Sequence, residues 1–74
     1  MTHLLPGFQT VSGHDAKRDG PYLELIELET GDEVAEAFYV DEKLKLLQFK
    51  DRLSPELIAA FVARAKATLA PKTR

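Results

Sequence analysis

The stretch Tyr22–Asp51 decides the fold of this chain. It runs YLELIELE over residues 22–29, a turn with the sequence TGD at 30–32, VAEAFYV over 34–40, and KLKLLQFK over 43–50. Short segments rich in aromatic and branched apolar residues, separated by Gly and Asp, are typical of β-strands joined by hairpin turns. We therefore expect a three-stranded antiparallel meander in this stretch.

The second connection of this meander sets which residues share a face. A three-residue loop at residues 41–43 would pair Val40 with Leu44 and Phe38 with Leu46. That register gathers one apolar set: Val34, Phe38, Val40, Leu44 and Leu46. The opposite face then carries a second set: Leu23, Leu25, Ala35, Ala37, Tyr39, Leu47 and Phe49. A slip of one residue would mix the two sets, because strand side chains alternate between faces.

A helix is expected after the strands. Ser54 is a good N-cap, Pro55 suits the first helical position, and Glu56 suits the positive end of the helix dipole. The apolar residues that follow recur at helical spacing: Leu57, Ile58, Phe61, Val62, Ala65 and Leu69. With Pro71 as the stop, we expect one amphipathic C-terminal helix over residues 54–70, packed on the sheet.

The N-terminal part has no such regular pattern. Residues 1–21 scatter apolar side chains among Pro and Gly, which predicts an irregular arm with at most a short strand at 8–11. The expected architecture is one small α+β domain over residues 1–74, with the arm, the meander over 22–51 and the helix over 54–70. One helix covers one face of the sheet, so the arm, a second copy or a partner is needed over the other.

Composition limits the size class of the domain and the compartment in which we expect the protein. The chain has 74 residues and no cysteine, with 45% hydrophobic and 30% charged residues. Such a chain is near the lower size limit for a single core without crosslinks. The absence of cysteine favours a reducing compartment, and no signal peptide or membrane-spanning run is evident. We therefore expect a cytoplasmic protein with no membrane partner.

No catalytic or cofactor-binding signature is present. His14 and Asp15 are adjacent, but a metal site needs three or four converging ligands. Ser12 near His14 lacks a positioned base and an orienting group, and the phosphate-binding glycine patterns are absent. We therefore predict a non-enzymatic protein with no catalytic residue, no metal site and no cofactor.

The charges are strongly segregated along the chain, although the net charge is only -2. Residues 22–42 contain acids and no base: Glu24, Glu27, Glu29, Asp32, Glu33, Glu36, Asp41 and Glu42. The bases dominate from residue 43 onward: Lys43, Lys45, Lys50, Arg52, Arg64, Lys66, Lys72 and Arg74. An acidic hairpin suits docking to a basic protein surface, where charge complementarity raises the association rate. The alternative is that the acids only keep the strands soluble.

The preferred hypothesis is a small protein-binding module, acting as an inhibitor, immunity-type factor or adaptor. Its predicted contact residues are Glu27, Glu29, Asp32, Glu33, Glu36, Tyr39 and Phe49. One alternative is a homodimer that uses the second apolar sheet face or an exposed edge strand. Another is nucleic-acid binding by the basic half, with Tyr39 and Phe49 stacking on bases, which the eight neighbouring acids disfavour.

Overall fold

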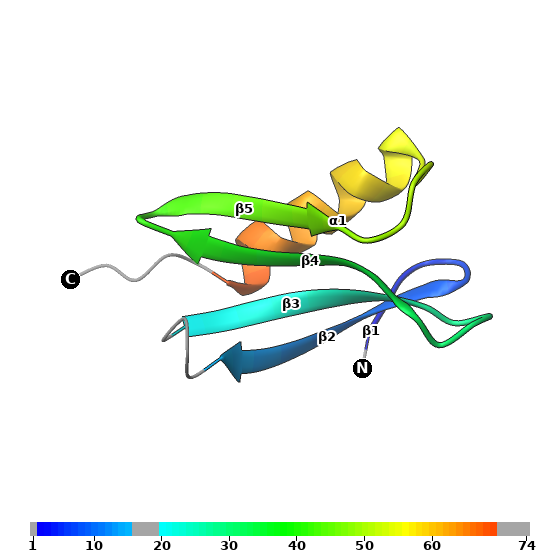
Figure 1. The fold of residues 1–74 in the computed structure, drawn as a ribbon, viewed down its shortest axis with the longest axis horizontal. Coiled ribbons are helices and arrows are strands. Elements are labelled where there is room, and N and C mark those ends of the chain that lie inside the picture. The colour runs from blue at the N-terminus through cyan, green and yellow to red at the C-terminus, as the bar shows by residue number, and fades with distance from the viewer. Residues whose placement is uncertain (1, 16–19, 70–74) are drawn as a thin grey trace.

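A computed structural model describes residues 2–15 and 20–69, which form five strands and one helix (Figure 1). The strands are β1 Thr2–Leu5, β2 Phe8–Asp15, β3 Gly20–Glu27, β4 Glu33–Val40 and β5 Lys43–Gln48. The helix α1 spans Pro55–Thr68. The strands lie in the sheet in chain order, and each neighbouring pair is antiparallel. The fold is therefore α+β, with a five-stranded meander.

The prediction of a three-stranded sheet with an irregular arm at residues 1–21 is wrong, because β1 and β2 form a hairpin there. Gly7, in the turn of this hairpin, has a φ of 87°, which glycine adopts at little cost. β2 then pairs with β3 along its full length. Because β2 is mostly polar, its sequence carries little hydrophobic alternation, which is the main signal for a strand. Residues 1 and 16–19 of the predicted arm lie outside the described residues.

The predicted register between β4 and β5 is wrong by one residue. Asp41 and Glu42 form a two-residue turn with φ angles of 53° and 68°, and Val40 pairs with Lys43. Two successive positive φ angles characterise a type I′ hairpin turn. The shift moves the β5 side chains to the opposite face relative to β4. The face toward α1, called the inner face below, therefore combines members of both predicted sets: Ala35, Ala37, Tyr39, Leu44 and Leu46.

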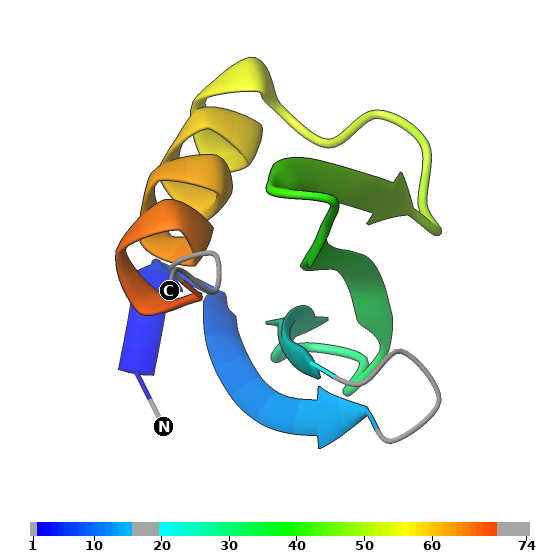
Figure 2. The same cartoon turned by 90° about the vertical axis from the view of Figure 1, so that its left-hand side faces the viewer.

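A β-bulge lies in β4. Leu25 pairs with Ala35 whereas Ile26 pairs with Glu33, which leaves Val34 as the extra residue. Val34 and Ala35 are consecutive, yet they are only 1% and 0% exposed. A bulge bends its strand and increases the local twist. The alternation of buried and exposed residues therefore fails here, and the sheet curls (Figure 2).

The helix α1 crosses the concave inner face and packs against β1, β3 and β4 (Figure 2). Its start is capped as predicted, since the Leu57 N–H donates to Ser54 Oγ at 3.0 Å. The buried positions from the helix side recur every four residues: Leu57, Phe61, Ala65 and Leu69. The buried strand residues opposite them are Leu23, Leu25, Val34, Ala35 and Ala37. The C-terminal helix is confirmed, and residue 70 of its predicted range lies outside the described residues.

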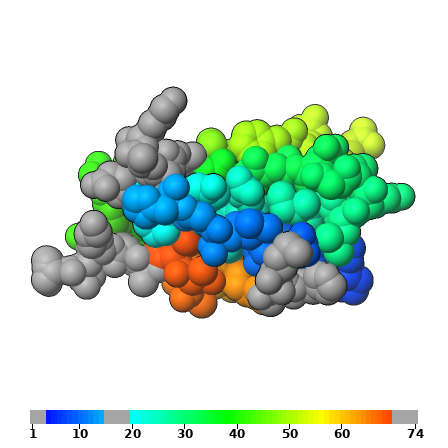
Figure 3. All heavy atoms as spheres, turned by 90° about the horizontal axis from the view of Figure 1, so that it is seen from below, coloured from blue at the N-terminus to red at the C-terminus, as the bar shows by residue number. Residues whose placement is uncertain are grey.

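The N-terminal hairpin completes the core from its side instead of covering the second face of the sheet. Leu4, Leu5 and Phe8 pack against the buried cluster. The guanidinium of Arg64 on α1 donates to Oγ1 of Thr10 on β2 at 3.5 Å, and Thr10 is only 5% exposed. In the space-filling view, the atoms of β2 and of the last turns of α1 lie side by side (Figure 3).

The convex face, called the outer face below, has no helix over it within residues 2–15 and 20–69 (Figure 2). The β3 and β4 residues that were predicted to lie on the second, uncovered face of the sheet lie under α1 instead. Their predicted companions Leu47 and Phe49 lie on the outer face, where they are 43% and 55% exposed. The exposed apolar side chains of the predicted second face therefore lie on β5 and directly after it.

Candidate functional site

Three connections meet at one end of the molecule: the β1–β2 turn, the β3–β4 turn and the segment between β5 and α1 (Figure 1). The β3–β4 turn, called the acidic turn below, spans residues 27–32. Two backbone hydrogen bonds close it, from Gly31 N to Glu27 O at 2.7 Å and from Glu27 N to Asp32 O at 2.9 Å. The Leu28 N–H donates to Gly7 O at 2.9 Å, which fastens the acidic turn to the β1–β2 turn.

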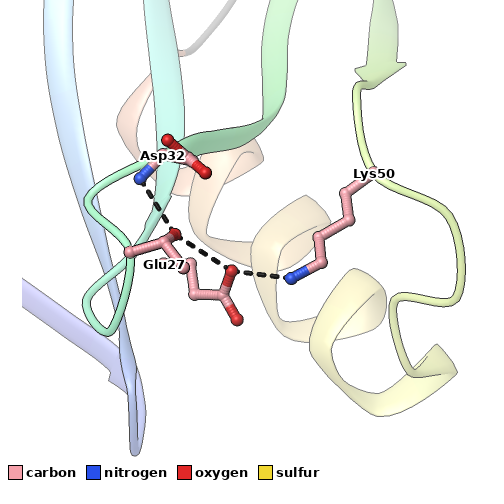
Figure 4. A network of polar contacts seen from close by, with 4 residues as sticks. Glu27, Asp32 and Lys50 are labelled. Atoms are coloured by element: carbon pink, nitrogen blue, oxygen red, sulfur yellow. Dashed lines mark hydrogen bonds and ion pairs between the residues drawn. The ribbon is translucent and has the colours of Figure 1, made fainter.

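An ion pair holds the third connection to the acidic turn. Lys50 reaches from the segment after β5 to Glu27 at the end of β3, with its Nζ 2.7 Å from Glu27 Oε1 (Figure 4). The Thr30 hydroxyl donates to the same carboxylate oxygen at 3.2 Å, and the Asp32 N–H donates to that hydroxyl at 3.2 Å. The Glu27 side chain is 17% exposed and that of Lys50 is 50% exposed, so the carboxylate is the more enclosed member.

The two charges shift each other's pKa in the directions expected for an ion pair. The hydrogen bond from Lys50 lowers the pKa of Glu27, against the opposing effect of partial desolvation. The hydrogen bond to Glu27 raises the pKa of Lys50, and the nearby charges of Asp32 and Glu29 raise it further. Three carboxylates therefore act on the one ammonium group of Lys50.

The structure brings some of the predicted contact residues together and separates others. Glu29 and Asp32 are exposed in the acidic turn, and Glu27 beside them is engaged with Lys50. Phe49 is exposed next to Lys50 in the sequence. The remaining three are placed differently: Glu33 is half-buried at the start of β4, Glu36 is 8% exposed beside Glu24 on the outer face, and Tyr39 is half-buried on the inner face.

Two residues of this end were missed by the sequence reasoning. Leu28 lies within the acidic turn and is 42% exposed, although it looked like one more apolar strand residue. Lys50 was assigned to the basic half, yet it closes onto the acidic hairpin. Leu28 carried a weak signal, since it lies two residues from the Thr30-Gly31 turn. Lys50 carried none, because its partner is 23 positions away in the chain.

The candidates for catalysis and for metal binding do not converge. His14 lies near the end of β2, opposite Pro21, and its side chain is exposed. No group of three or more His, Cys, Asp or Glu residues that could hold a metal ion is found among the described residues. The side chains of His3 and Asp15 lie outside what the structure describes.

The basic residues are spread over different surfaces. Lys43 and Lys45 are exposed on the outer face of β5, whereas Arg64 and Lys66 belong to α1 on the other side of the sheet. Tyr39 and Phe49 lie on opposite faces, so they do not form one stacking platform. Lys72 and Arg74 lie outside the described residues. These four bases are therefore divided between the outer face of β5 and the helix α1 and do not form one basic surface.

None of the protein-family models, curated proteins or solved structures with which the chain was compared matches it. No helix within the described residues combines the length and the apolar character needed to cross a membrane.

Proposed function

We propose that this chain is a non-enzymatic protein-binding module that docks its acidic turn onto a basic surface of a partner, as an inhibitor, immunity-type factor or adaptor. The observation that carries the proposal is the exposed pair of carboxylates, Glu29 and Asp32, beside the exposed apolar side chain of Leu28. An apolar contact surrounded by a polar rim is the usual arrangement of a protein-binding surface.

The hydrogen bonds around the turn support the proposal because they limit its freedom before binding. The turn is closed by its own backbone, fastened to Gly7, and held by the Glu27–Lys50 ion pair. A surface that is ordered in the free protein loses less conformational entropy on binding. A cytoplasmic location belongs to the same proposal and is supported by the absence of cysteine.

The test compares two variants that each remove two negative charges from opposite ends of β4. One variant is Glu29→Gln with Asp32→Asn in the acidic turn. The matched control is Asp41→Asn with Glu42→Asn in the β4–β5 turn, where asparagine tolerates the positive φ angles. Both variants have the same net charge, so the position of the removed charges is the only difference in electrostatics.

Affinity capture from the source cells, with identification by mass spectrometry, should recover a partner with the unmodified protein and with the control. Recovery with the acidic-turn variant should be much lower. With the purified partner, stopped-flow measurements should show association slowed by roughly 3- to 10-fold at low salt, because charge steering acts on the association rate. Equal capture and equal rates for the two variants would contradict the proposal.

A further inference from the structure

The strand β5 forms an open edge of the sheet. β4 pairs with one side of it, and no strand among the described residues pairs with the other side. Lys43–Gln48 is regular along its length, without a bulge or a proline. Open edges of this kind present unpaired backbone groups to solvent and can accept another strand.

The hydrogen-bonding pattern identifies which backbone groups are free. A two-residue turn makes its flanking residues, Val40 and Lys43, a hydrogen-bonded pair, and hydrogen-bonded pairs recur at every second position in an antiparallel ladder. The same alternation reaches Phe49, whose N–H donates to Val34 O at 2.9 Å. The odd-numbered residues of β5 therefore bond to β4. The even-numbered residues direct their N–H and C=O groups to the open side: Leu44, Leu46 and Gln48.

The exposed apolar side chains near this edge also support its pairing with another strand. Four large apolar side chains are exposed within the described residues, and two of them lie on β5 or directly after it: Leu47 and Phe49. Exposed apolar side chains that gather next to unpaired backbone are typical of a surface that becomes buried in an assembly.

We propose that the partner of this edge is a second copy of the same chain, paired antiparallel about a two-fold axis at Leu46. Leu46 then faces Leu46 of the second copy, and Leu44 faces Gln48, so the free backbone groups of both strands bond to one another. On the outer face, Lys45 lies opposite Leu47 and Lys43 lies opposite Phe49. The two sheets continue into each other, with both helices on the same side.

The charges of β5 favour this register and this partner. Each lysine meets an apolar side chain of the other copy, which covers the methylene groups of the lysine. Moving the two-fold axis to Lys45 would oppose two lysines, which is unfavourable across strands. Moving it to Leu47 would leave the backbone of Leu44 without a partner inside the strand. Lysines on an edge often prevent pairing, but in the Leu46-centred register they do not face each other.

Hydrogen exchange of the purified full chain, followed by NMR across a concentration series, tests the proposal directly. As concentration rises, the amides of Leu44, Leu46 and Gln48 should become protected. The amides of Lys45 and Leu47, already bonded to β4, should change little. Sedimentation velocity on the same samples should show a monomer–dimer equilibrium. A monomer at all concentrations, or a dimer without this alternating protection, would overturn the proposal.

A charge exchange tests the register. Leu47→Lys sets an additional lysine opposite Lys45 of the other copy at two symmetric places, and should weaken dimerisation by about tenfold. Adding Lys45→Glu to this variant places each introduced carboxylate opposite an introduced ammonium group of the other copy, and should restore the dimer. In a register centred on residue 45 or 47 the double variant would oppose like charges, so a failure to restore in a folded double variant contradicts the proposal.

The control for these variants is Val40→Lys, which adds the same charge to an exposed apolar position of β4. It should leave dimerisation within about twofold, since residue 40 does not lie in the new strand pair. Circular dichroism of each variant shows whether the monomer remains folded. The dimer proposal is independent of the proposed partner docking, because Glu29→Gln with Asp32→Asn leaves β5 unchanged and should not affect self-association.

Discussion

The two edges of this sheet are built in opposite ways. β1 spans only Thr2–Leu5, its pairing with β2 is interrupted between His3 and Leu5, and it packs against α1. β5 is longer and regular, and most of its residues are exposed. A short, irregular strand covered by a helix is a poor template for further pairing, whereas a regular exposed strand is a good one.

This difference shows which edge of the sheet is covered within the chain and which edge is exposed to solvent. At β1 the half-buried side chains of Leu4 and Leu5 pack against the core, and the strand contacts α1. At β5 only Leu44 and Leu46 pack against the core, and the outer face of the strand carries the exposed side chains of Lys43, Lys45 and Leu47. The helix α1 therefore completes the core on the β1 side, and intermolecular contacts are expected on the β5 side and at the acidic turn.

The largest difference in the free energy of unfolding is expected between Phe→Ala in the core and the same substitution beside the exposed edge. Phe61→Ala removes a ring that is 0% exposed, and should lower the free energy of unfolding by about 3–5 kcal/mol. Phe49→Ala removes a ring that is 55% exposed beside β5, and should cost less than about 1 kcal/mol in the monomer. Urea denaturation at low protein concentration measures both.

A domain of this size has only about 3–5 kcal/mol of stability from its core, so Phe61→Ala could unfold it. If Phe61→Ala were as mild as Phe49→Ala, the helix stripe would not be the centre of the core.

A smaller loss of stability is expected from a substitution in the part of β2 that does not pair with β1. Gly13 pairs with Tyr22, and a Cβ on Gly13 would lie 2.5 Å from Tyr22 Oη and 2.6 Å from its Cζ. The tyrosine therefore covers the bare glycine backbone near the edge. Gly13→Ala should lower the free energy of unfolding by about 1–3 kcal/mol, because the ring has to move.

The control for Gly13→Ala is the same substitution in a Tyr22→Leu background, which removes the clashing ring atoms. The cost of the alanine should fall by more than half there, as measured in a double-mutant cycle. An equal cost in both backgrounds would show that the backbone of Gly13, not Tyr22, sets the penalty.

The smallest effect concerns the ion pair that fastens the end of β5 to the acidic turn. The lowered pKa of Glu27 means that its contribution is complete above its ordinary value of 4.5 and disappears as pH falls through the lowered pKa. The raised pKa of Lys50 means that its contribution is complete below 10.5 and disappears as pH rises through the raised pKa. The pair therefore stabilises the fold across neutral pH.

Lys50→Met should consequently lower the urea midpoint slightly at neutral pH and have almost no effect in strong acid, where Glu27 is protonated. The effect is small because exposed ion pairs are screened by solvent. The matched control is Lys45→Met, which removes the same charge from an exposed position of β5. A loss of equal size in acid and at neutral pH would mean that Lys50 acts through its packing, not its charge.

The parts of the fold that sequence reasoning predicted are those with local causes. The helix follows from its Ser54 cap, its Pro55 start and its apolar spacing, all within one segment. The acidic turn follows from Gly31, whose φ is 78°. The hairpin of β1 and β2 was missed because a polar strand gains its stability from its neighbours, in this case from pairing with β3.

The candidate site was predictable only as a region. Glu29 and Asp32 were expected as exposed acids because the turn itself exposes them. Glu36 and Tyr39 were included for their charge and their aromatic ring, but their burial depends on the strands beside them. The ion pair of Glu27 joins two segments that are far apart in the chain, so no local pattern could indicate it.

The sequence by itself determined the helix, the acidic turn, the α+β class and the segregation of charge, because each depends on residues close together in the chain. The tertiary structure decided the number of strands, the faces of β4 and β5, and the open edge. The physical reason is that strand pairing is long-range. A two-residue turn in place of a three-residue loop changes the face of every β5 side chain relative to β4, and only the folded sheet shows which turn forms.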